Sequence, residues 1–166
     1  MLANNFDTWM MLTGILINAA APPVSAWLAD SYPNSSPTGS IFLSAFTTKT
    51  AILALILLFP GEPVLIGIGL FMVMYGIIYA LLENDIRRIL AYSIVNQVGF
   101  MVCAVGIGTQ MALNGAAAHA FAHIIYKALL FMSAGVVVYR TGFNRCSEVG
   151  GLFRTMPLTE IGRAHV

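Results

Sequence analysis

The sequence predicts an all-α protein, a polytopic bundle of transmembrane helices with about five crossings. Its 166 residues are 58% hydrophobic and only 9% charged, and the mean hydropathy is +0.83. A soluble domain with so few charged residues would have too little polar surface. The apolar residues also fall into successive runs of membrane-spanning length, separated by proline, glycine and charged residues. A net charge of +1 argues against a nucleic-acid or acidic partner.

The first crossing is predicted to be a broken helix. Residues 8–21 are hydrophobic but short for a full crossing, and Pro22-Pro23 interrupts them. Residues 24–30 resume the helix and contain Trp27, which suits the membrane interface. Irregular backbone at membrane depth is tolerated only against protein or a hydrated cavity. The alternative is an ordinary helix followed by an interfacial segment.

Two further helices follow. Turn residues predict a loop at 31–39, and residues 39–58 form the second helix. The middle of that helix places Lys49 at the bilayer centre, with Thr48 beside it. Residues 64–81 form a third helix, which carries no charged residue and is predicted to be scaffold.

The fourth helix, 88–107, follows a charged loop at 82–88 and carries a polar stripe at i,i+4 spacing. This stripe either makes hydrogen bonds between helices or lines a hydrated path. Its members are Tyr92, Ser93, Asn96 and Gln97.

The fifth helix, 112–138, carries His119, His123 and Lys127 at a spacing of four, which stacks them along one side. Lys127 lies near the bilayer centre. The helix end is ~16 Å away at ~1.5 Å per residue, whereas a lysine stem reaches only ~6 Å. Burying this lysine costs about 2.5–3.5 kcal/mol, so we expect it to have a function.

These groups favour a proton or cation pathway. Histidine exchanges protons near neutral pH, and two histidines followed by a lysine can form a relay through water. The alternatives are histidines satisfied within the core and a metal site at His119 and His123, which lacks a third ligand. No metal, cofactor or catalytic residue is predicted, because no nucleophile–base pair or cofactor motif is present and Cys103 and Cys146 match no metal or redox spacing.

Positive charges predict the orientation. With five crossings, residues 30–38, the loop at 82–88 and the basic exit segment at 140–159 lie on one side. That side is expected to be cytoplasmic, because it carries five arginines and the turns on the other side carry no Lys or Arg. The five are Arg87, Arg88, Arg140, Arg145 and Arg154.

Four segments of the chain carry sequence motifs. They are Pro23-x-x-x-Trp-Leu-x-Asp-x-Tyr32, Asp85-Ile-Arg-Arg-Ile-Leu-Ala-Tyr-Ser93 with Asn96-Gln97-Val-Gly99, His119-x-x-x-His-x-x-x-Lys-Ala-Leu-Leu-Phe131, and Glu148-Val-Gly-Gly-Leu-x-Arg-x-Met-Pro157. These segments resemble the antiporter-like membrane subunits shared by respiratory complex I and multisubunit sodium/proton antiporters, where they are the D-type subunits. Thr38 to Lys49 also resembles the lysine-bearing helix of that family.

The resemblance implies a line of charged and polar residues at mid-membrane, with Lys49 as a central relay lysine. His119, His123 and Lys127 would continue that line. The family usually has a lysine where this chain has Asn18, and often a histidine where it has Ser25. Asn18 can line a hydrated path but cannot carry the charge.

The predicted function is proton or cation translocation in a multisubunit sodium/proton antiporter. The alternative is a proton-pumping membrane subunit of NADH:quinone oxidoreductase, in which the chain would belong to an enzyme. The expected partners are lipid, other membrane subunits, protons and sodium ions, in a bacterial inner membrane.

Residues 1–160 are expected to be a partial antiporter-like transmembrane domain, without the upstream and downstream helices of the family. Residues 161–166, Ile-Gly-Arg-Ala-His-Val, are what one reading frame of a common sequencing adapter encodes. We therefore expect them to be read-through and give Arg163 and His165 no role.

Overall fold

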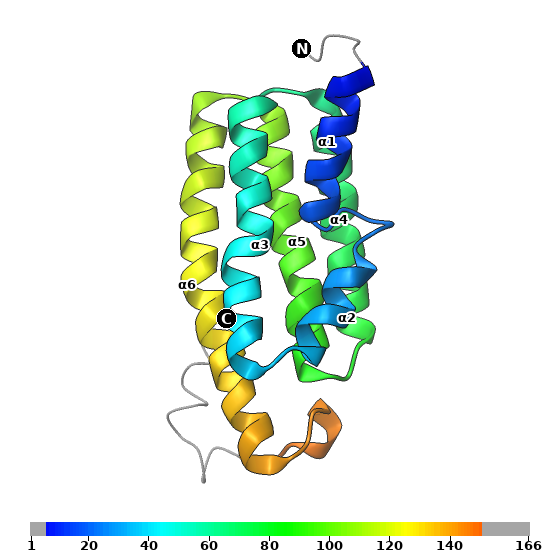
Figure 1. Cartoon of the computed structure of the whole chain (residues 1–166), viewed down its shortest axis with the longest axis vertical. Helices are drawn as coiled ribbons and strands as arrows, with labels where there is room; N and C mark the ends of the chain where they lie inside the picture. The colour runs from blue at the N-terminus through cyan, green and yellow to red at the C-terminus, as the bar shows by residue number, and fades with distance from the viewer. Residues whose placement is uncertain (1–5, 151–166) are drawn as a thin grey trace.

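Residues 6–150 are described by a computed structural model, and all regular structure in that range is helical. Four helices are long and apolar enough to cross a membrane. They are α3 (Pro37–Leu58), α4 (Pro63–Leu82), α5 (Ile86–Ile107) and α6 (Gln110–Thr141). Two shorter helices, α1 (Phe6–Asn18) and α2 (Ala26–Asn34), follow one another along the side of the bundle (Figure 1). The all-α membrane bundle with a broken first helix is therefore confirmed. The predicted read-through at 161–166 lies outside the described residues.

The break begins earlier than predicted, because α1 ends at Asn18 and not at residue 21. Ala20 has a positive φ of 61°, and the next amide, of Ala21, donates to the carbonyl of Leu16 at 2.9 Å. Together with the 3.0 Å bond from the Ala20 amide to the Ile17 carbonyl, this is a Schellman closure. The proline after Ala21 disfavours helical backbone at that residue, so the helix must close before it.

The predicted loop at 31–39 is wrong in extent, since only Ser35 and Ser36 separate α2 from α3. Ser36 caps α3 by accepting a 3.1 Å hydrogen bond from the amide of Gly39. The side-chain amide of Asn34 donates a hydrogen bond to the backbone carbonyl of Asp30 at 2.8 Å. The short polar residues of this stretch therefore finish one helix and start the next.

Helices α4 and α5 approach so closely that glycines set their separation. A Cβ atom at Gly69 would lie 2.6 Å from the Cys103 amide nitrogen, and one at Gly76 would lie 2.6 Å from the Asn96 amide nitrogen. A Cβ atom at Gly99 would lie 2.8 Å from the Gly69 carbonyl. Small residues that let helix backbones touch are typical of membrane helix pairs. The scaffold role of residues 64–81 stays a prediction, and these glycines set how closely the helix packs against α5.

Three connections lie at the same end of the bundle (the lower end in Figure 1): the α2–α3 turn, the α4–α5 connection and the segment after α6. Arg87 at the start of α5 donates to the carbonyls of Pro33, at 2.7 Å, and Ser35, at 3.1 Å, and also contacts the Ser40 hydroxyl. Its guanidinium therefore holds the α2–α3 turn against α5.

The segment after α6 lies at the same end. The Ile86 amide donates to the Asn144 carbonyl at 3.0 Å, and the Cys146 amide donates to the Asn84 carbonyl at 2.9 Å. Helix α6 itself runs to Thr141, beyond the predicted limit of 138. The three connections predicted to share a side of the membrane thus share an end of the bundle.

Candidate functional site

Lys49 lies in the middle of α3, buried against the bundle with only 7% of its surface exposed. Its ammonium group donates to the Ser44 carbonyl at 2.6 Å and to the Thr48 hydroxyl at 3.2 Å. Ser40, Ser44 and Thr48 are fully buried, so hydroxyl groups follow one face of α3 up to the lysine. The sequence assigned Thr48 as a lining residue and gave no such role to Ser40 and Ser44, although their i,i+4 spacing was a usable signal.

Lys127 on α6 is also buried, and its partner comes from another helix. Its ammonium group donates to the Ser93 hydroxyl of α5 at 2.5 Å. Ser93 in turn donates to the Leu90 carbonyl at 2.8 Å. Helices α3 to α6 contain no aspartate or glutamate between their ends, so neutral oxygens are the partners of both lysines.

His119 and His123 lie one turn apart on α6, with ring centroids 6.2 Å apart, but differ in their surroundings. His123 is fully buried, and neither ring nitrogen has a hydrogen-bond partner among the described residues. The side-chain oxygen of Asn96 is likewise buried without a partner in the described part of the chain. Buried polar atoms of this kind are normally satisfied by water.

His119 is only partly buried and contacts the polar stripe of α5. Its Nε2 atom lies 2.9 Å from the side-chain oxygen of Gln97. The Tyr126 hydroxyl donates to the same oxygen at 3.4 Å. The Tyr126 ring also meets the His123 ring edge-on, with centroids 5.0 Å apart.

The structure brings the predicted ionisable residues together. Lys49 lies within electrostatic reach of Lys127 and of both histidines, although it belongs to a different helix. The predicted polar residues Ser93 and Gln97 contact this group directly. Asn18, in contrast, is exposed at the end of α1 and makes none of these hydrogen bonds.

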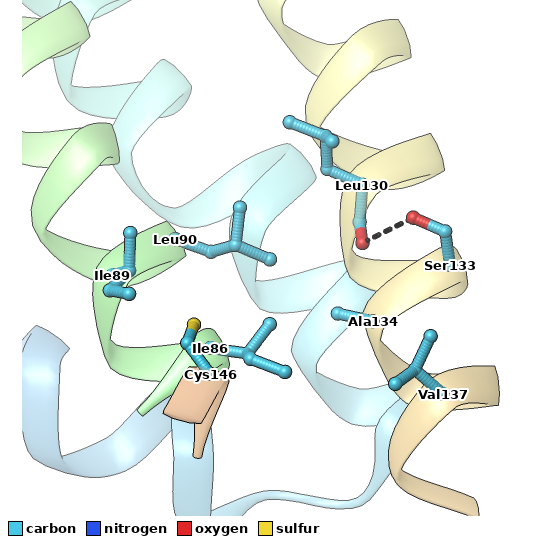
Figure 2. Close-up of a pocket in the computed structure, with 8 residues that line it drawn as sticks. All are labelled: Ile86, Ile89, Leu90, Leu130, Ser133, Ala134, Val137 and Cys146. Carbon is cyan, nitrogen blue, oxygen red and sulfur yellow. Dashed lines mark hydrogen bonds between the residues drawn. The ribbon is translucent and has the colours of Figure 1, made fainter. Parts of the chain in front are cut away.

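A cavity of about 170 Å³ lies between the start of α5 and the end of α6 (Figure 2). Leu90, whose carbonyl accepts the Ser93 hydrogen bond, is one of its walls. The Ser133 hydroxyl there is bonded to the Leu130 carbonyl at 2.9 Å. The walls are mainly aliphatic, so the cavity offers no charged ligand. Within residues 6–150, no three His, Cys, Asp or Glu side chains are grouped to hold a metal ion.

The fold and the site define a class, a polytopic membrane protein that keeps lysines and histidines together between its helices. Residues 1–162 match the NADH:quinone oxidoreductase/Mrp antiporter transmembrane family, and the chain belongs to it.

Relatives in this family carry two kinds of name. The chain is 36% identical over 160 residues to NADH-quinone oxidoreductase subunit N of Desulforudis audaxviator, covering 90% of this chain and 32% of the relative. It is 37% identical over 145 residues to the D-type subunit of the Na(+)/H(+) antiporter of Alkalihalophilus pseudofirmus, covering 81% of this chain and 29% of the relative. The chain thus spans about a third of the length of these relatives.

Two solved membrane complexes contain a similar fold. A chain of the Mrp complex from Dietzia matches with a TM-score of 0.88 and 30% identity, over 92% of this chain and 30% of the other. A chain of the archaeal membrane-bound sulfane sulfur reductase matches with a TM-score of 0.86 and 28% identity, over 93% of this chain and 34% of the other.

Proposed function

We propose that this chain is part of a subunit that translocates protons across a bacterial inner membrane within a multisubunit sodium/proton antiporter. The observation that carries the proposal is the burial of Lys49, Lys127 and His123 together, without a carboxylate in α3 to α6. Such groups are costly in a membrane and are typical of ion pathways. The likeness to a Na(+)/H(+) antiporter subunit and to an Mrp complex supports the sodium/proton assignment.

In this mechanism, protons pass through water among Lys49, His119, His123 and Lys127. The lysines are held by neutral oxygens, which bind an ammonium group but do not neutralise it. Each can therefore release its proton without breaking an ion pair. The partnerless ring nitrogens of His123 and oxygen of Asn96 are suited to bind the intervening water.

The second candidate function is proton pumping as a membrane subunit of NADH:quinone oxidoreductase. The match to subunit N favours it, because that match covers more of this chain than the match to the antiporter subunit. The chemistry of electron transfer would then lie in other subunits, since we assign no catalytic residue here. Neighbouring genes separate the two candidates: small antiporter genes support the first, and genes for iron–sulfur and hydrogenase-like subunits support the second.

Proton transport by the full-length subunit in its complex tests the proposal. In inverted membrane vesicles holding a pH gradient, added sodium is expected to collapse the gradient, read with a pH-sensitive dye. Vesicles without the complex are the control. A gradient formed on NADH oxidation and unaffected by sodium would favour the second candidate. Absence of both responses would contradict proton translocation.

Labelling of Cys146 tests the proposed orientation, in which the loop at 82–88 and the segment at 140–159 are cytoplasmic. Cys146 is exposed in the segment after α6, whereas Cys103 lies within α5 and serves as the internal control. A membrane-impermeant maleimide is expected to label Cys146 in inverted vesicles but not in intact spheroplasts. The reverse pattern would contradict the orientation.

A further inference from the structure

The two histidines of α6 offer their ring nitrogens to different surroundings. His119 has one nitrogen, Nε2, 2.9 Å from the side-chain oxygen of Gln97, whereas both nitrogens of His123 lack a described partner. A neutral histidine carries one N–H donor and one acceptor nitrogen, and its neighbours decide which is which. The two rings are therefore expected to bind and release protons differently.

Gln97 fixes the protonation pattern of His119. An amide oxygen has no proton to give, so a hydrogen bond at 2.9 Å requires the proton to be on Nε2 of His119. Nδ1 is then the acceptor nitrogen. The Tyr126 hydroxyl also lies near this oxygen, at 3.4 Å.

The consequence concerns how a proton can leave His119. A histidine that passes protons onward accepts one at one nitrogen and releases another from the other nitrogen. An amide oxygen accepts a hydrogen bond but does not take up the proton, so the Nε2 proton of His119 has no onward acceptor. A proton that binds Nδ1 must leave from Nδ1, and the ring returns to its starting tautomer.

We propose that Gln97 is a positioning residue that makes His119 a terminal proton store, and that His123 is the ring through which protons pass. The transport part rests on the proposed function, and the tautomer part does not. Tyr126 contacts both Gln97 and His123, because its hydroxyl donates to the Gln97 oxygen and its ring packs edge-on against the His123 ring.

Histidine tautomers in the full-length subunit, returned to lipid, test the positioning role. With ¹⁵N-labelled histidine and solid-state NMR, the His119 signals are identified by difference from His119→Asn. Wild-type neutral His119 is expected to carry its proton on Nε2. Gln97→Leu should give a mixture of both tautomers, while Gln97→Glu, which keeps an acceptor oxygen, should retain the Nε2 proton. A proton on Nδ1 in wild type, or no change in Gln97→Leu, would overturn the assignment.

Transport by two asparagine variants tests the terminal role. His119→Asn is expected to slow proton transport by about threefold, since only a store is lost, whereas His123→Asn should slow it by at least about thirtyfold. Equal losses in the two variants would overturn the distinction between store and passage. If wild type moves no protons, the proposed function fails, and the tautomer result still stands by itself.

Discussion

Replacing Lys127 by methionine in the full-length subunit is expected to lower coupled proton transport by at least about a hundredfold. Methionine keeps much of the length of the side chain but cannot hold a proton. The Lys127 ammonium is buried, and the hydroxyl of Ser93 to which it is bonded cannot replace it as a proton carrier at this position. The measurement is the rate of pH change in inverted vesicles, normalised to the amount of assembled subunit.

The same substitution should leave assembly intact, because burying the lysine charge disfavours insertion by about 2.5–3.5 kcal/mol and methionine removes that cost. Met132→Ala, on an exposed face of α6, is the matched control and should transport normally. Lys127→Arg, which keeps a charge but releases a proton with difficulty, should also transport poorly. Wild-type transport by Lys127→Met would contradict a role for Lys127 in the pathway.

Gly69→Ala is expected to destabilise the subunit by about 1–3 kcal/mol or more, because overpacking forces the backbones apart. The new Cβ atom would meet the Cys103 amide nitrogen at 2.6 Å and the Gly99 carbonyl at 2.7 Å. Both are backbone atoms of α5 and cannot rotate away. The measurement is the thermal unfolding midpoint of the tagged subunit in mild detergent.

Gly67→Ala provides a matched control two residues away on α4. A Cβ atom there would meet nothing within 4 Å, so its unfolding midpoint should stay near that of the wild type. Equal midpoints for Gly67→Ala and Gly69→Ala would show that α4 and α5 do not pack as described.

The positions of the long helices could be predicted because apolar runs end at strong local signals. Pro37, Pro63 and Gly108 mark the starts and ends of three helices within two residues of the predicted limits. The connection at 31–39 was predicted too long, because serine and asparagine favour both loops and helix caps. Only the hydrogen bonds of Ser36 and Asn34 show which role they take.

The sequence predicts which residues of the candidate site share one face of a helix, but not which residues of two different helices meet. The spacing of His119, His123 and Lys127 places them on one side of α6 from the sequence alone. Their partners Gln97 and Ser93 depend on how α5 slides and rotates against α6, which local patterns do not specify. Burial of Ser40 and Ser44 depends likewise on which face of α3 meets the bundle.

The glycine contacts between α4 and α5 have a mechanical consequence. Two helices whose backbones interlock are expected to move together, so a shift is easier where α6 packs against α5 than between α4 and α5. The bonds from Lys127 to Ser93 and from His119 to Gln97 both cross that boundary. Loss of the Lys127 proton would weaken its bond to Ser93. In the proposed mechanism, the contact between α5 and α6 would therefore respond to whether Lys127 holds a proton.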